Sequence, residues 1–221
     1  MLFQDRVEAG AILARHLLDF AHRDDVVVLA LPRGGVPVAA EVAAFLDAPL
    51  DVFVVRKLGV PGQEEFAMGA IASGGVRVVN WDIVRAMRIP ASIVDDVTRA
   101  EQRELERREQ LYRGDRPPVD VAGRTVILVD DGLATGATMK AAVRAVRELS
   151  PRQIVVAVPV SARDACVDLG AEADACVAAE TPEPFFGVGR WYRNFSQTTD
   201  EEVRRLLARA RRGAQPTLGT F

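Results

Sequence analysis

Runs of apolar residues alternate along this chain with segments in which apolar residues recur every three or four positions. Unbroken β-branched and aliphatic runs are typical of strands buried on both faces of a parallel sheet, and the three-to-four spacing is typical of packing helices. The expected strands are 26–31, 51–55, 126–129, 153–159 and 173–177, and the expected helices are 7–20, 38–46, 139–149 and 162–169. This order predicts an α/β fold with an open, mostly parallel twisted sheet and flanking helices.

Two segments depart from this alternation. Residues 67–72 and 76–79 flank Ser73, Gly74 and Gly75, which predicts a small hairpin. Residues 92–113 carry charges of alternating sign, which predicts a long, mostly solvated helix inserted in the fold and braced by pairs such as Glu104 with Arg108. We expect one domain over 1–212 and a flexible tail over 213–221.

The chemistry of the chain centres on Val126 to Thr138, which reads VILVDDGLATGAT. The apolar run predicts a buried strand that ends in Asp130 and Asp131. The following loop of small residues and hydroxyls leads into a helix beginning near Gly136, whose unpaired N–H groups favour an anion such as phosphate. Adjacent carboxylates repel phosphate, but they accept hydrogen bonds from sugar hydroxyls or hold a divalent cation through water, so the stretch predicts a ribose-phosphate site.

Other phosphate motifs do not fit this stretch. The loop lacks the Lys-Ser/Thr ending of a P-loop, and no GxGxxG follows a predicted strand, so neither nucleotide fingerprint applies. The remaining structural alternative is a strand-to-helix turn in which Asp and Thr only cap the helix.

The stretch resembles the donor motif of the type I phosphoribosyltransferases, which use 5-phosphoribosyl 1-pyrophosphate (PRPP). The resemblance lies in the apolar strand, the two acidic residues and the Thr-Gly-x-Thr turn. It implies that Asp130 and Asp131 bind the ribose hydroxyls. It also implies a 5′-phosphate site made by Ala134, Thr135, Gly136, Ala137 and Thr138.

A second anion loop follows the first predicted strand, at Pro32 to Pro37. Paired glycines allow close backbone approach, Arg33 offers a fixed cationic fork, and a helix start follows. A plain strand-to-helix turn with an exposed arginine is the alternative. In the resembling family this position holds a pyrophosphate loop, which implies pyrophosphate binding by Arg33, Gly34 and Gly35 and a cis non-proline peptide nearby.

Arg56 and Lys57 follow the second predicted strand and precede a loop bearing Gly59, Pro61 and Gly62. Their place at a strand end predicts a mobile arm that closes over pyrophosphate. The resemblance favours this role, because the family carries basic residues near its flexible catalytic loop in this part of the chain.

Aromatic residues cluster in 180–196, although the chain is only 6% aromatic. Phe185, Phe186, Trp191 and Tyr192 either anchor this segment on the sheet edge or stack against an acceptor base. The resemblance implies a variable hood at about 178–198 that recognises a flat base. We keep both interpretations.

Composition excludes several classes of protein. A net charge of −3 gives no hint of a nucleic-acid surface, no apolar run would span a bilayer, and residues 1–10 are too charged for a signal peptide. We therefore expect a cytoplasmic protein that binds neither membrane nor nucleic acid. Cys166 and Cys176 are expected to be buried reduced thiols, and no direct protein metal site is expected.

The resemblance as a whole implies transfer of ribose 5-phosphate from PRPP, carried with Mg²⁺, to a nitrogenous acceptor, with Asp130, Asp131, Arg33 and Lys57 as catalytic residues. Ala134 stands where the 6-oxopurine salvage branch has an acid, so the loop is nearer the adenine-salvage and competence-related branches. The alternatives are a PRPP- or nucleotide-binding regulator and a hydrolase of a phosphoribosyl substrate. A homodimer is possible in each case.

Overall fold

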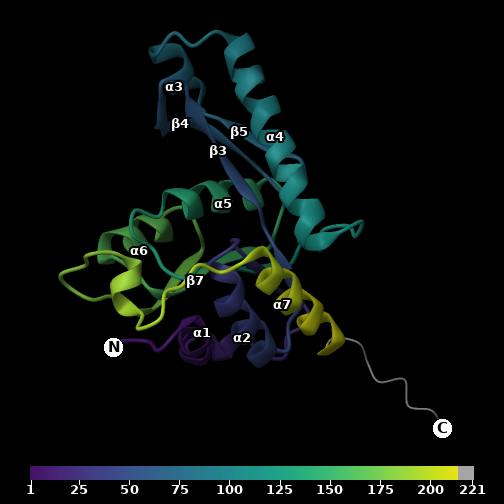
Figure 1. The fold of residues 1–221 in the computed structure, drawn as a ribbon, viewed down its shortest axis with the longest axis vertical. Coiled ribbons are helices and arrows are strands. Elements are labelled where there is room, and N and C mark those ends of the chain that lie inside the picture. The colour runs from purple at the N-terminus through teal and green to yellow at the C-terminus, as the bar shows by residue number, and fades with distance from the viewer. Residues whose placement is uncertain (214–221) are drawn as a thin grey trace.

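A five-stranded parallel sheet forms the centre of the molecule (Figure 1), in a computed structural model that describes residues 1–213. Its order is β2-β1-β6-β7-β8. The bounds are β1 Val26–Ala30, β2 Leu50–Val52, β6 Thr125–Val129, β7 Gln153–Val160 and β8 Ala175–Glu180. The predicted α/β class with a parallel sheet is confirmed.

Helices cover both faces of this sheet, as the unbroken apolar strands require. Val28 and Ala30 of β1 share one hydrophobic core with α1 (Arg6–Arg15), α2 (Gly35–Leu46) and α7 (Asp200–Gly213). Val27 and Leu29 point the other way, into a second core with α5 (Ala137–Arg147) and α6 (Arg163–Gly170). Successive strand residues therefore serve opposite cores, which is the two-residue period of a β-strand.

Residues 55–113 form a second structural unit, which we call the arm and which stands at one end of the long axis of the molecule (Figure 1). It contains the antiparallel sheet β3 (Val55–Val60), β4 (Gln63–Ala72) and β5 (Val76–Val79), followed by α3 (Trp81–Ala86) and α4 (Ala91–Arg113). The predicted hairpin around Gly74 and Gly75 is present as β4 and β5. The Glu104–Arg108 pair of α4 is present at 2.7 Å.

The loop expected after Arg56 and Lys57 is instead a pair of strands. β3 pairs with β4, and Pro61 and Gly62 make only the tight turn between them. Gly59 lies where the register of the two strands shifts, so its presence marks a β-bulge. The glycines and the proline therefore form the turn and the bulge of a hairpin, and they do not belong to an irregular loop.

The two cysteines form a disulfide that joins α6 to β8, so the expectation of free thiols was wrong. Both cysteines are only half-buried, so their apolar context overstated their burial, and it does not reveal which elements meet. The fold brings the Cα atoms of Cys166 and Cys176 to 5.8 Å, within the range that a disulfide requires.

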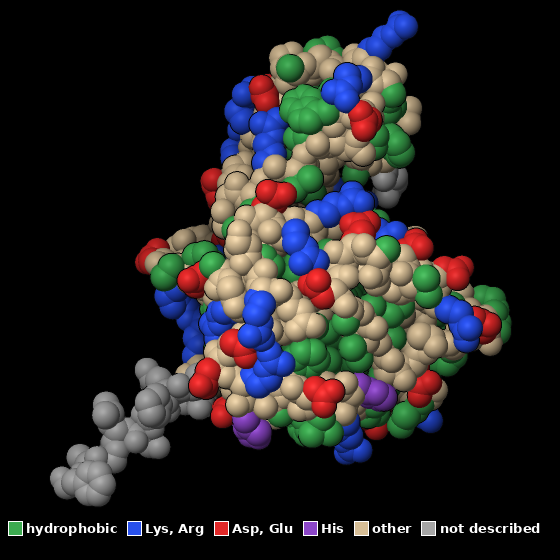
Figure 2. All heavy atoms as spheres, turned by 180° about the vertical axis from the view of Figure 1, so that it is seen from behind, with side chains coloured by type: hydrophobic (Ala, Val, Ile, Leu, Met, Phe, Trp, Pro, Cys, Tyr) green, Lys and Arg blue, Asp and Glu red, His purple; other side chains and the backbone are tan. Residues whose placement is uncertain are grey.

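Two short 3₁₀ turns, Leu18–Phe20 and Val188–Trp191, complete the secondary structure of the described chain. The predicted tail begins at Gly213, the last residue of α7, and its residues 214–221 lie outside the described part. None of the described helices is long and apolar enough to cross a membrane. On the face drawn in Figure 2, basic and acidic side chains are interspersed.

Candidate functional site

The site lies where β1 and β6 end side by side. Ala30 pairs in register with Val129, and the amide of Leu31 donates to the carbonyl of Val129 at 2.9 Å. The residues that follow these two strands therefore emerge together at one edge of the sheet, where ligands bind in open α/β folds. This brings the Arg33–Gly35 loop against Asp130 and Asp131.

Gly34 and Gly35 are required by the closeness of this contact. A Cβ atom on Gly34 would overlap the carboxylate of Asp131, and one on Gly35 would lie 2.6 Å from the carbonyl oxygen of Val129 and 2.9 Å from the Cα of Asp130. The two glycines therefore let the loop sit directly on the acidic pair. The peptide bond between Pro32 and Arg33 is cis, as the resemblance implied.

The two carboxylates differ in their surroundings. Burial raises the pKa of Asp130 well above its ordinary value, and the neighbouring charge of Asp131 raises it further. Burial also raises the pKa of Asp131, but the Arg6 guanidinium opposes that rise. The Asp130 carboxylate also accepts a hydrogen bond from the backbone N–H of Asp131 at 2.8 Å.

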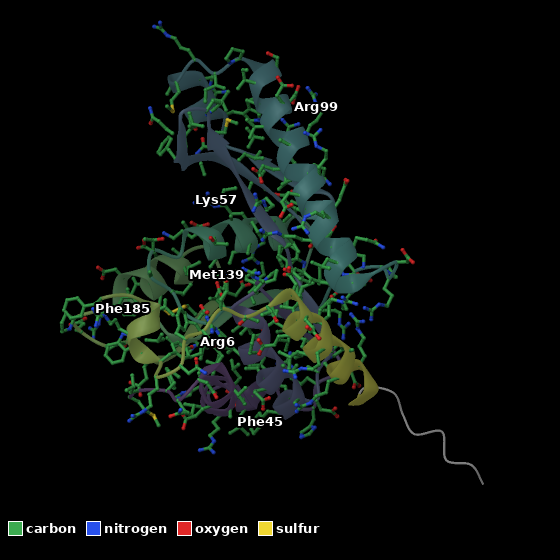
Figure 3. The ribbon with its side chains drawn as sticks, in the orientation of Figure 1. Arg6, Phe45, Lys57, Arg99, Met139 and Phe185 are labelled. Carbon is green, nitrogen blue, oxygen red and sulfur yellow. A yellow bond between two sulfur atoms is a disulfide. The ribbon has the colours of Figure 1, made fainter. Side chains whose placement is uncertain are left out.

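Arg6 is a site residue that the sequence analysis missed. Its Nε and Nη2 atoms lie 2.9 and 2.8 Å from Oδ2 of Asp131, and Figure 3 shows Arg6 within the core region, close to the C-terminal segment. The two residues are 125 positions apart. No local pattern signals a contact over that separation, and Arg6 lies in a helix that the apolar spacing marks only for packing.

The loop predicted to bind phosphate leads directly into α5. Gly136 precedes α5 with a φ of +69°, a conformation that favours glycine, and α5 begins at Ala137. The loop is anchored by buried Leu133, whose N–H donates to the carbonyl of Val160 at 2.9 Å. Ala134, Thr135, Ala137 and Thr138 are exposed, so the first turn of α5 can offer its N–H groups and hydroxyls to an anion.

Arg33 is half-buried and faces the start of α7. Its Nη1 lies 3.8 Å from Oδ1 of Asp200, and the same oxygen accepts a hydrogen bond from the hydroxyl of Tyr112 at 2.6 Å. The C-terminal helix thus places a carboxylate beside the cation that was predicted to bind pyrophosphate.

Arg56 and Lys57 lie on opposite faces of β3, because consecutive residues of a strand alternate between its two faces. Arg56 pairs with Glu101 of α4 at 2.6 Å. Lys57 lines a cavity of about 640 Å³ between the arm and α5, together with Trp81, Ala137 and Lys140, and Figure 3 places it above α5. Only Lys57 is therefore near the phosphate loop.

The aromatic segment lies against the acidic loop, since a Cβ atom on Gly132 would lie 2.6 Å from Val188. Phe185, Trp191 and Tyr192 pack in a small hydrophobic cluster with Phe3, and the Tyr192 hydroxyl donates to the backbone carbonyl of Asp131 at 2.6 Å. Figure 3 draws Phe185 at the periphery of the molecule. Phe186 is 77% exposed, so among the four predicted base-binding aromatics it has the most accessible ring.

Asp130 and Asp131 are the two site carboxylates that could contact a cation. Among the side chains that the structure describes, no group of three or more His, Cys, Asp or Glu residues gathers to hold a metal ion. Asp130 and Asp131 provide adjacent carboxylates beside an exposed phosphate loop. Such a pair suits Mg²⁺ that arrives on a phosphorylated ligand and keeps its water.

Comparisons with known proteins agree with this geometry. Residues 4–177 match the family model described as phosphoribosyl transferase domain. A Mycobacterium tuberculosis H37Rv protein named "putative phosphoribosyl transferase" is 50% identical over 211 residues, which are 96% of this chain and 47% of that protein. The chain thus spans about half the length of this curated relative.

Two further comparisons bear on the fold and on the family. The crystal structure of TT1426 from Thermus thermophilus superposes with a TM-score of 0.85 at 44% identity, covering 95% of this chain and 99% of that one. The bifunctional protein PyrR of Chloroflexus aurantiacus is 34% identical over 105 residues, 47% of this chain and 52% of that protein.

Proposed function

The chain belongs to the phosphoribosyl transferase domain family, and from this premise we propose that it transfers ribose 5-phosphate from PRPP to a nitrogenous acceptor and releases pyrophosphate. The observation that carries the proposal is the direct packing of the Gly34–Gly35 loop on Asp130 and Asp131, next to the exposed start of α5. A sugar that carries phosphates at both ends matches these three neighbouring elements.

Each part of the donor has a partner in this proposal. Asp130 and Asp131 accept hydrogen bonds from the ribose hydroxyls, and residues 134–138 hold the 5′-phosphate through N–H groups and hydroxyls. Arg33, the Gly34–Gly35 loop and Lys57 receive the pyrophosphate. Mg²⁺ carried with the donor, and contacting Asp130 and Asp131 through water, supplies neutralisation of the leaving group.

Catalysis then rests on position and charge. The carbon–oxygen bond at the anomeric carbon breaks as a carbon–nitrogen bond forms, and positive charge develops on the sugar. The ionised Asp130 and Asp131 stabilise that charge, while Arg33 and Lys57 stabilise the departing pyrophosphate. We assign Arg56 no part in this step, because its side chain is paired with Glu101.

Fewer residues of the site indicate the chemical class of the acceptor than that of the donor. Exposed Ala134 offers no carboxylate to a base, which favours an acceptor other than a 6-oxopurine. Phe186 offers an accessible ring on the segment that lies over Gly132, and we propose it as the aromatic contact of this segment with a flat acceptor.

The test is incubation with PRPP, Mg²⁺ and a panel of nitrogenous bases, following both pyrophosphate and PRPP. We expect pyrophosphate release that depends on one class of base and falls roughly a hundredfold or more in Asp131→Asn. Asp164→Asn, an exposed acid on α6, is the matched control and should keep the wild-type rate.

Other outcomes identify the alternatives. Tight donor binding with no base-dependent release would contradict transfer and indicate a regulator. Consumption of PRPP in the absence of any base would indicate hydrolysis.

A further inference from the structure

The side chain of Arg6 makes a charge-assisted contact with the acidic pair. Its Nε and Nη2 atoms both approach Oδ2 of Asp131, at 2.9 and 2.8 Å. The side chains of Arg6 and Asp131 are only 11% and 16% exposed, so water screens the pair weakly. Asp5 caps α1 by accepting hydrogen bonds from the N–H groups of Val7 and Glu8, which fixes where the helix begins and thus where Arg6 stands.

The guanidinium of Arg6 is held on its other sides by the C-terminal segment. Its Nη1 donates to the carbonyl of Ser196 at 2.8 Å, and its Cζ lies 4.0 Å from the centre of the Phe195 ring. The hydroxyl of Tyr192, from the same segment, donates to the backbone carbonyl of Asp131. Side chain and backbone of Asp131 are therefore both fixed from outside the loop in which Asp131 lies.

We propose that Arg6 is a positioning residue that holds the Asp131 carboxylate in the orientation that receives the ribose of the donor. The proposal rests on the proposed function. Both Arg6 contacts fall on Oδ2, so Asp131 can accept a ribose hydroxyl through Oδ1 without losing Arg6. The arginine also offsets the repulsion between the two adjacent, partly buried carboxylates when both are ionised.

Arg6 and Asp131 lie within the part of the chain matched by the family model, but the segment that holds Arg6 does not. Residues 192–196, which hold Arg6, lie beyond residues 4–177, the part matched by the family model. The contacts therefore extend the site to the C-terminal segment and give residues 192–196 a role in donor binding that does not require contact with an acceptor.

The test compares the affinities of two ligands by calorimetry, Mg²⁺–PRPP and Mg²⁺–pyrophosphate. Only PRPP has the ribose that Asp131 would hold, whereas pyrophosphate alone needs the Arg33–Gly35 loop. We expect Arg6→Gln to weaken PRPP binding roughly 10- to 100-fold, the effect of losing a charged hydrogen-bonding partner, and to leave pyrophosphate binding within twofold. Arg6→Lys, which keeps the charge but loses the two-pronged contact, should recover part of the loss.

Two further variants complete the test, one as a control and one as a second probe of the Arg6 contacts. Arg15→Gln, at the exposed end of the same helix, should bind both ligands as the wild type does. Phe195→Leu keeps the ion pair but removes the ring under the guanidinium, and it should weaken PRPP binding several-fold. If Arg6→Gln does not fold, the positioning role is tested with Arg6→Lys and Phe195→Leu by the same comparison of PRPP and pyrophosphate affinities.

Equal weakening of both ligands in Arg6→Gln, Arg6→Lys and Phe195→Leu, or unchanged PRPP binding in these three variants, would overturn the positioning role. Failure of the wild-type protein to bind PRPP at all would overturn the proposed function, and this inference with it. The two failures are therefore distinguishable.

Discussion

Asp130 is the residue at which function and stability conflict. Burial and the charge of Asp131 raise its pKa well above the ordinary value of 3.8, so the folded state favours the protonated carboxyl. As the pH rises from 3.8 through the folded pKa, the folded state comes to hold a buried charge and loses stability relative to the unfolded chain. Ribose binding nevertheless requires the ionised carboxylate in our proposal.

Asp130→Asn should therefore stabilise the fold at pH 8 while abolishing transfer. Asparagine retains an oxygen that can accept from the N–H of Asp131, so the local hydrogen bond is kept. We expect the free energy of unfolding at pH 8 to rise by about 0.5 to 2 kcal/mol, and the gain to vanish near pH 4. Urea unfolding at several pH values measures this.

The matched variant for that experiment is Asp131→Asn. It leaves the buried guanidinium of Arg6 without its carboxylate, so it should lower the free energy of unfolding. A destabilised Asp130→Asn at pH 8 would contradict the assignment of burial as the dominant effect at Asp130.

Among the elements, α7 acts on the site through its first residue. Asp200 lies beside Arg33 and accepts the hydrogen bond of Tyr112 from α4. Burial, and secondly this hydrogen bond, raise the pKa of Tyr112 to about 12. Asp200 therefore partly neutralises Arg33, the cation to which we assign the pyrophosphate of the donor.

Asp200→Asn should raise the affinity of Arg33 for pyrophosphate and lower the pKa of Tyr112. Without the carboxylate, Arg33 should bind Mg²⁺–pyrophosphate a few-fold more tightly, and the pKa of Tyr112 should fall from about 12 while staying above 10, because burial remains. Calorimetry and the absorbance of the phenolate measure the two effects. Glu201→Gln, the exposed neighbour, should change neither, and an unchanged pyrophosphate affinity in Asp200→Asn would remove Asp200 from this role.

The elements also show what a sequence can predict. The strands β1 and β6 and the loops after them were predicted because their apolar runs and glycines are local, and the Gly34–Gly35 contact with the acidic pair follows from parallel neighbours ending at one edge. The strand β3 was missed because Gly59, Pro61 and Gly62 mark both loops and tight turns. Arg6, Asp200 and the Cys166–Cys176 disulfide were missed because tertiary packing decides those contacts.

At the scale of the whole molecule, one buried ion pair connects the arm to the central sheet. Arg113, the last residue of α4, donates from Nε to Oδ2 of Asp51 in β2 at 3.1 Å, and the two side chains are 5% and 4% exposed. Asp51 also accepts from the N–H groups of Val52 and Val119. The carboxylate is thus held by hydrogen bonds from both sides of the junction between the two units.

Asp51→Ala should loosen this junction, because it leaves the Arg113 charge buried without this carboxylate. Arg113 keeps its ion pair with Glu109 at 3.0 Å, so we expect the free energy of unfolding to fall by an amount near the lower end of the about 3 to 5 kcal/mol that breaking a buried pair costs. Glu104→Ala, which removes the solvated pair with Arg108 on the same helix, should cost only a few tenths of a kcal/mol.

The two tryptophans allow the arm and the core to be followed separately, since Trp81 begins α3 and Trp191 packs beside Phe3 in the core region. Single-tryptophan versions, Trp81→Phe and Trp191→Phe, should report one common urea transition in the otherwise unchanged protein. In Asp51→Ala the Trp81 signal should change at lower urea than the Trp191 signal. Coincident transitions with a loss below about 1 kcal/mol would show instead that the remaining contacts of α4 with β3 and α7 hold the arm in place.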